Sequence, residues 1–239
     1  MNRTRIVLIV AAAGVIAAGS WACLVARSFA AAPAADPSAA SAPAVEPKVA
    51  HLPKPRMQGG MPLMEALKNR RSSRQFDAGK SLPDQVLSDL LWAAFGVNRE
   101  DGRRTAPSAV NWQEIDIYAV KADGIWRFDA KAHELSLVAD GDRRSLTGGQ
   151  PFVKDAAVNL VYVADLAKAG RGSEVDKTLY TAADTGFIAQ NVYLFCASEG
   201  LGTVVRGSIN RAALSKAMNL KDTQRIILAQ SVGYPPQGK

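Results

Sequence analysis

The sequence predicts an α+β domain. Segments with helical and strand-like periodicity follow one another without strict alternation, and this order is typical of α+β proteins. The chain has 239 residues, of which 48% are hydrophobic, enough for one substantial core. A charge-free helical segment at residues 185–198 and alternating strand patterns at residues 114–129 are further signals. We therefore expect one folded domain at residues 57–239.

Helical patterns open this domain. The first helix is predicted at residues 61–71, with Pro62 near its start. A second helix is predicted at residues 81–96, where Ser81 can cap the start and Gly96 can end the helix.

Strand patterns follow. Alternating apolar residues predict a strand at residues 114–122, and an Asp-Gly pair predicts a hairpin turn into residues 125–129. Residues 133–142 are interpreted as an extension of this hairpin or as its partner strand. Residues 157–166 are more continuously apolar, as expected of a strand that is covered on both faces.

The last part of the domain contains a long helix at residues 176–202, with Gly200 in position for a left-handed helix end. A strand at residues 203–209, a helix at residues 210–220 and a final strand at residues 225–235 complete the pattern.

The long helix also predicts an association. It has no charged residue between Asp184 and Glu199, and its apolar side chains point in every direction. A helix that is apolar all round must be buried all round, and so small a domain has little room for it at its centre. We infer a homodimer with this helix at the interface; the alternative is a central helix of a monomer.

Residues 1–30 lie outside the predicted domain. A basic start is followed by the uncharged apolar run 6–26, which is typical of an export signal or, given its length, of an uncleaved membrane anchor. Arg3 and Arg5 favour an inside N-terminus, which places the domain outside the cytoplasmic membrane, exported or anchored; a cytoplasmic-facing anchor is the alternative. Residues 31–56 are rich in Ala, Pro and Ser and predict a flexible linker.

Composition limits the function. Net charge is +7, part of it in the N-terminal segment, and a mildly basic domain suits small anionic ligands at least as well as nucleic acid. The chain has only two cysteines and two histidines. We therefore expect no disulfide framework, no zinc or other cysteine- or histidine-rich metal site, and no histidine-based catalytic triad.

The segment "NRRSSRQF", residues 69–76, is a candidate anion site. Arg70 and Arg71 are also consistent with a solvated helix end, where cations are favoured. Arg74 and the hydroxyls of Ser72 and Ser73 extend past that end, and guanidinium and hydroxyl donors together suit a phosphate-sized anion. Nucleic acid is less favoured, because no aromatic residues are interleaved with the basic ones.

A second candidate is "PSAVNWQ", residues 107–113. Pro107, Ser108 and Asn111 place a hydroxyl and an amide on a rigid turn just before a strand. The alternative is an ordinary turn in which Ser108 caps a short helix.

With these two segments the chain resembles the FMN-dependent nitroreductase family, from about residue 61 to its end. Four patterns carry the resemblance, in the order and spacing of the family: "RRSSRQF", "PSAVNWQ", the long helix with "DTG" and "QN" running into "GLGT", and "VGYP". The resemblance implies a central, mostly antiparallel sheet flanked by helices and a long helix buried at a homodimer interface.

The resemblance also implies roles for the arginine segment. Arg70 and Ser72 would hold the phosphate and ribityl chain of FMN, with Arg71 in the same motif, and Arg74 would reach the pyrimidine edge of the flavin ring. Further basic residues near the C-terminus hold the phosphate in the family. The present chain stops at Lys239, so that lysine alone is expected in this role.

In the family, the second segment belongs to the other subunit's site. Pro107, Ser108 and Asn111 would therefore contact the FMN of the partner, in agreement with the homodimer. Arg206 and Gly207 match the stretch whose backbone N–H groups face flavin N5 and O4, and a glycine permits close approach there.

The chemistry implied is two-step hydride transfer through flavin N5, from a donor that includes NAD(P)H to a small acceptor such as a nitroaromatic or a quinone. The flavin supplies the reactivity and the protein supplies orientation and electrostatics, so no catalytic side chain is expected. The hairpin and the long helix look closest to the SagB-type dehydrogenase branch, whose members include azoline oxidases. A non-catalytic flavin-binding domain is the further alternative.

Overall fold

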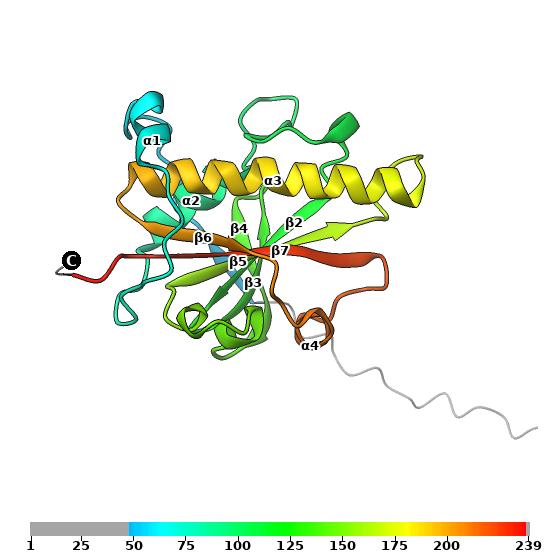
Figure 1. The fold of residues 1–239 in the computed structure, drawn as a ribbon. Coiled ribbons are helices and arrows are strands. Elements are labelled where there is room, and N and C mark those ends of the chain that lie inside the picture. Colours follow the sequence, from blue (N-terminus) through cyan, green and yellow to red (C-terminus); the bar gives the residue numbers. More distant parts are fainter. Residues whose placement is uncertain (1–47, 238–239) are drawn as a thin grey trace, which may run out of the picture. The chain divides into compact units, whose positions relative to one another are not determined.

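The computed structural model describes residues 48–237, and these form one seven-stranded sheet with helices on both faces (Figure 1). The strand order is β1-β4-β3-β2-β5-β7-β6, and every pair of neighbours is antiparallel. The α+β prediction is confirmed. The strands are β1 (Val49–His51), β2 (Ile115–Lys121), β3 (Gly124–Asp129), β4 (Glu134–Asp140), β5 (Val158–Asp165), β6 (Gly202–Arg206) and β7 (Gln224–Gly233).

The longest helix, α3, crosses one face of the sheet together with α2, while α4 covers the opposite face (Figure 1). Short 3-10 turns lie at residues 109–111, 144–147 and 151–153. The helices are α1 (Leu63–Asn69), α2 (Asp84–Phe95), α3 (Glu174–Ser198) and α4 (Arg211–Ala217).

The predicted hairpin is present. β2 pairs with β3 through the Asp123 turn, and β4 pairs with β3 as a separate strand, which resolves the alternative left open by the sequence. Gly124 has φ +156°, and a side chain there would collide with the carbonyl oxygen of Ala139 at 2.6 Å. The turn therefore needs glycine for space as well as for backbone freedom.

β5 lies at the centre of the sheet between β2 and β7, and all its residues except Asp165 are buried. Leu160 and Tyr162 belong to the core cluster under α3, whereas Val161 and Val163 pack on the other side with α4. The continuously apolar sequence is thus explained by coverage of both faces, as predicted.

The predicted start of α2 differs from the structure, whereas its predicted end at Gly96 is confirmed. Ser81 does not cap α2: Pro83 is the N-cap, with an extended ψ of 149°, and no side chain caps the helix. Gly96 ends α2 but is extended, with φ −71°; glycine is required because a Cβ would collide with Trp92.

The boundaries of α3 follow local chemistry. Ser173 and Asp176 form a capping box, so the helix starts two residues before the predicted position. At the other end Gly200 is left-handed, with φ +68°, and the N–H of Leu201 donates to the carbonyl of Cys196 at 2.8 Å. This helix end was predicted correctly.

The folded part begins earlier than the sequence predicted. β1 pairs with β4, Arg56 forms an ion pair with Asp89, and the hydroxyl of Ser88 donates to the carbonyl of Pro53 at 2.5 Å. The end of the linker at residue 56 is therefore wrong, because its last residues bind backbone and carboxylate groups of the domain.

The predicted signal or anchor, most of the predicted linker and Lys239 lie outside the described residues. Among residues 48–237 no helix combines the length and the apolar character that crossing a membrane requires.

Candidate functional site

The arginine segment runs beside the edge strand β6. α1 ends at Asn69, and Arg70 leaves the helix with an extended backbone. The N–H of Ser73 donates to the carbonyl of Thr203 at 2.8 Å, and the N–H of Asp77 donates to Tyr234 at 2.9 Å. These backbone bonds fix residues 70–77 against β6 and the end of β7.

Tyr193 of α3 joins this segment to β6. Its ring lies 5.3 Å from the guanidinium of Arg70, and its hydroxyl lies 2.8 Å from the hydroxyl of Ser72. The same hydroxyl accepts the backbone N–H of Val205 at 3.0 Å. The hydroxyl of Tyr193 therefore links Ser72, a predicted contact of the phosphate and ribityl chain, to Val205, which lies two residues before Gly207.

The three arginines of this segment carry uncompensated charge. Within residues 48–237, Arg70, Arg71 and Arg74 form no ion pair. Ser72 beside them is exposed and has its hydroxyl oriented by Tyr193. Guanidinium donors without carboxylate partners, next to an oriented hydroxyl, suit an anionic ligand such as a phosphate.

The second predicted segment is a strained loop over α3. The N–H of Ala109 donates to Asp184 at 2.8 Å, and Val110, Asn111 and Gln113 have φ between +50° and +56°. Positive φ is costly for residues other than glycine and is often found at functional sites. Ser108 precedes a short 3-10 turn but does not cap it; its hydroxyl accepts the N–H of Gln113 at 3.0 Å.

The structure does not bring the two segments together within one chain. The loop is attached to α3 at Asp184 and the arginine segment at Tyr193. Tyr193 follows Asp184 by nine positions along the helix, a rise of roughly 13 Å at 1.5 Å per residue. We refer to the two segments as half-sites, because each carries part of the predicted set of ligand contacts.

The α3 helix has two faces of different exposure. Ile188, Val192 and Cys196 are fully buried against the sheet, whereas Leu179 is 62% and Phe187 48% exposed. The alternative of a helix buried at the centre of a monomer is therefore wrong, because the uncharged outer face is open to solvent in the single chain.

Arg206 has a different position from the other predicted arginines. It is only 5% exposed and donates to the carbonyl of Thr147 at 2.6 Å, to Asn159 at 2.8 Å and to Ser231 at 3.1 Å. All these acceptors are neutral, and burial lowers the pKa of Arg206 to about 10. Its side chain is occupied inside the protein, and its backbone pairs with Ala229 of β7. Gly207 beside it is exposed.

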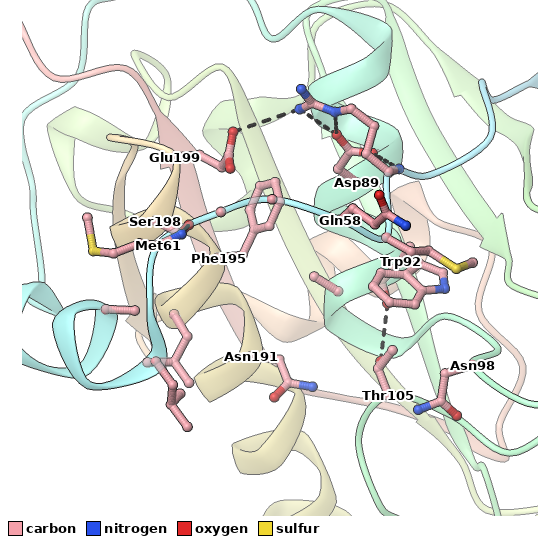
Figure 2. Close-up of a pocket in the computed structure, with 18 residues that line it drawn as sticks. Gln58, Met61, Asp89, Trp92, Asn98, Thr105, Asn191, Phe195, Ser198 and Glu199 are labelled. Carbon is pink, nitrogen blue, oxygen red and sulfur yellow. Dashed lines mark hydrogen bonds and ion pairs between the residues drawn. The ribbon is translucent and has the colours of Figure 1, made fainter.

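A cavity of 580 Å³ lies elsewhere, between residues 56–61, α2 and α3 (Figure 2). Arg56 bridges Asp89 and Glu199 there, and Trp92 and Phe195 form apolar walls. None of the predicted site residues lines it. Its charges already pair with one another, so we do not assign the anion site to it. A smaller cavity of 230 Å³ adjoins Arg71 and Tyr193 and agrees better with the predicted site.

Sequence reasoning missed a buried acid at the base of the strained loop. Glu114 is fully buried at the start of β2, and neither carboxyl oxygen has a hydrogen-bond partner in the described structure. Burial and the neighbouring carboxyl of Asp184 raise the pKa of Glu114 to about 7. The only available signal was an acidic residue directly after the second motif, where a strand begins.

Comparison with known proteins establishes the class of protein. The structure of a candidate nitroreductase from Ralstonia eutropha is 43% identical and superposes with a TM-score of 0.75, over 80% of the present chain and 90% of the other. A candidate nitroreductase of Methanocaldococcus jannaschii is 28% identical over 176 residues, 70% of this chain and 88% of the relative. The chain is therefore an oxidoreductase.

The family follows from the sequence match. Residues 67–234 match the model of the nitroreductase family, and the chain belongs to that family. The NADPH-flavin oxidoreductase of Vibrio harveyi is 28% identical over 112 residues, which is 42% of this chain and 47% of that relative. The solved NADPH:FMN oxidoreductase of the same organism shares the fold, with 23% identity, a TM-score of 0.56 and coverage of 73% of this chain and 69% of that chain.

The buried position of Arg206 leads to a stability prediction. Replacing Arg206 with Met leaves the carbonyl of Thr147 and the side chains of Asn159 and Ser231 without donors in a dry interior. We expect the free energy of unfolding to fall by about 2–4 kcal/mol in chemical denaturation. The matched change Arg127→Met removes an exposed guanidinium and should stay within about 0.5 kcal/mol of wild type. Equal effects of the two changes would contradict the role assigned to Arg206.

Proposed function

We propose that this protein is an FMN-dependent oxidoreductase that transfers hydride from a donor such as NAD(P)H, through the flavin, to a small acceptor such as a nitroaromatic or a quinone. One observation carries the proposal. The hydroxyl of Tyr193 contacts both the hydroxyl of Ser72 and the backbone N–H of Val205. The arginine segment, whose charge is uncompensated, is thereby held beside the end of β6, which Gly207 follows. Family membership and the two Vibrio harveyi flavin oxidoreductases named above support it.

The residues present fit FMN. Arg70, Arg71 and Ser72 offer charged and hydroxyl donors to a phosphate and a ribityl chain, and no carboxylate in the described structure competes for them. At Gly207 an added Cβ would meet only a side-chain atom of Leu228 at 3.8 Å, so a planar ring can approach the backbone.

When bound, FMN accepts and releases hydride at N5. The protein's part is to bind, orient and stabilise charge. The cation of Arg74 would stabilise negative charge at the pyrimidine edge of the ring, and the backbone N–H of Gly207 would donate to its N5 and O4 edge. No side chain acts as nucleophile or acid in this scheme.

We place the second half of each site on a partner subunit. Pro107, Ser108 and Asn111 of the partner subunit would complete the flavin site. Two features support this: the separate attachment of the half-sites to α3, and the exposed uncharged face of that helix. An outer face with exposed Val175, Leu179 and Phe187 is expected to be covered by another apolar surface.

The phosphate contact can be tested through flavin affinity. Purified protein should show the visible spectrum of bound FMN. Arg70→Ala should weaken FMN binding by about tenfold to a hundredfold, from the loss of a charge-assisted bond of about 1.5–3 kcal/mol. Riboflavin lacks the phosphate and should bind wild type and mutant alike.

The matched control is Lys68→Ala, which removes an exposed cation from the last turn of α1. Equal FMN affinity in Arg70→Ala and Lys68→Ala would mean that Arg70 is only a solvated helix end. Protein that stays colourless and cannot be reconstituted with FMN would remove the flavin assignment altogether.

The shared site predicts complementation between two defective variants. Arg70→Ala and Asn111→Ala should each disable both sites of their own homodimer. A mixed dimer would have one site with both lesions and one with neither. Random assortment of equal amounts makes half of the dimers mixed, so about a quarter of all sites should bind FMN and turn over. No recovery, with mixed dimers confirmed by native mass spectrometry, would mean that both half-sites serve one flavin within a chain.

The N-terminal segment adds a proposal on location. Its basic start and apolar run support export or anchoring, with the domain outside the cytoplasmic membrane. A reporter fused after Lys239 should then be active only outside the cytoplasm, and a reporter active only inside would contradict this. An exported enzyme does not meet cytosolic NAD(P)H. Either its donor is a membrane or periplasmic carrier, or the apolar segment anchors the domain facing the cytoplasm, where NAD(P)H can serve.

A further inference from the structure

Glu114 and Asp184 form a buried carboxyl pair that the proposed chemistry does not use. Asp184 is 2% exposed and lies on α3; Glu114 is fully buried at the start of β2. Asp184 accepts the N–H of Ala109 at 2.8 Å, whereas Glu114 meets no donor within residues 48–237. The pair therefore offers four carboxyl oxygens to a single N–H donor.

Such a pair resists carrying two negative charges. An ionised carboxylate without hydrogen bonds is expensive in a dry interior, and a neighbouring carboxylate adds repulsion. The pair therefore keeps one proton to a higher pH than an isolated carboxyl group would. This proton belongs on Glu114, because the N–H of Ala109 stabilises the ionised form of Asp184. A protonated Glu114 can then donate its O–H to Asp184.

Other charges near the pair are already engaged. Lys168, after β5, is the cation that acts on Glu114, but its amine lies 2.6 Å from a carboxylate oxygen of Asp116. Arg104 donates to the side chain of Gln113 at 2.9 Å. Among residues 48–237, these contacts leave the pair without a cation of its own.

The position of the pair explains what it does. Val110, Asn111 and Gln113 have positive φ, and a strained conformation persists only when its surroundings fix it. Ala109, just before this stretch, is bonded to Asp184, and Glu114 is the residue just after it. One end of the strained stretch is thus hydrogen-bonded to Asp184, and the other end continues directly into Glu114.

We propose that Glu114 and Asp184 are positioning residues that share one proton and, through it, hold the Pro107–Gln113 loop in its strained conformation. The loop keeps this conformation while the proton is present and loosens when the second charge appears. The consequence for the partner's flavin rests on the function proposed above; the coupling between pair and loop does not.

The direction of the pH dependence follows from linkage. The pKa of Glu114 is raised from 4.5 to about 7, so the folded protein holds this proton more tightly than the unfolded chain does. The stabilisation is fully present below the ordinary pKa and is lost as pH rises to about 7. Above that pH the loop should become more mobile.

Hydrogen exchange of the loop amides tests this without any flavin. After correction for intrinsic exchange, protection of Ala109 in the full chain should fall by about tenfold between pH 6 and pH 8. Glu114→Gln supplies a neutral donor that does not titrate, and its protection should be independent of pH. Glu65→Gln, the same change at an exposed position of α1, should behave as wild type.

Asp184→Asn gives a second test if Glu114→Gln folds poorly. Asparagine can still accept the Ala109 N–H and donate to Glu114, so the pair carries one charge, and the loop should stay protected at pH 8. The proposal is overturned if wild-type protection does not depend on pH, or if Glu114→Gln shows the wild-type fall.

FMN affinity, measured at the same pH values, separates the two proposals. Weaker FMN binding above pH 7 in wild type, but not in Glu114→Gln, would support both. If protection of the loop depends on pH as described while FMN affinity does not, the proposal for the carboxyl pair is supported. The proposed contact of this loop with the flavin is then wrong.

Discussion

The site depends on hydrogen bonds made by two side chains of α3. Asp184 holds the Pro107–Gln113 loop through Ala109, and Tyr193 holds the arginine segment through Ser72. A helix packed on the sheet along one face is a rigid support, so both half-sites inherit its geometry. The uncharged outer face of the same helix is then available for a second subunit, which links catalysis to association in the function we propose.

The arginines show how the surroundings of a charge decide its role. Arg56 is exposed and bonded to Asp89, so its charge is compensated within the fold. Arg206 is buried among neutral acceptors, where it orders the ends of several strands. Arg70 and Arg74 are neither buried nor paired within the described residues. Only such free guanidinium groups remain available for an anionic ligand, and sequence spacing alone does not separate these three cases.

Local patterns in the sequence predicted most of the fold. The continuous apolar run of β5, the Asp-Gly turn and Gly200 at the end of α3 each follow from neighbouring residues, and each was predicted correctly. The start of α2 and the end of the linker were wrong, because contacts decide them. β1 exists only through its pairing with β4, more than eighty residues away in sequence.

For the site, the motif spacing indicated which segments matter but not how the protein holds them. The roles of Tyr193 and Asp184 depend on tertiary contacts, and a pattern of apolar residues cannot reveal a hydroxyl that bridges two segments. Glu114 could not be predicted either, since an acidic residue before a strand is normally exposed.

The carboxyl pair also shows why strain and burial occur together in this loop. A loop with three residues at positive φ needs strong, directional bonds at its ends. A hydrogen bond to a carboxylate is strongest where water is excluded, and the 2% exposure of Asp184 provides that condition. Yet the dry environment that strengthens the bond to Ala109 also opposes ionisation of the neighbouring Glu114, whose pKa is raised to about 7. The proton on Glu114 is therefore a consequence of holding the loop tightly, and any change that admits water to the pair should weaken the loop and release the proton together.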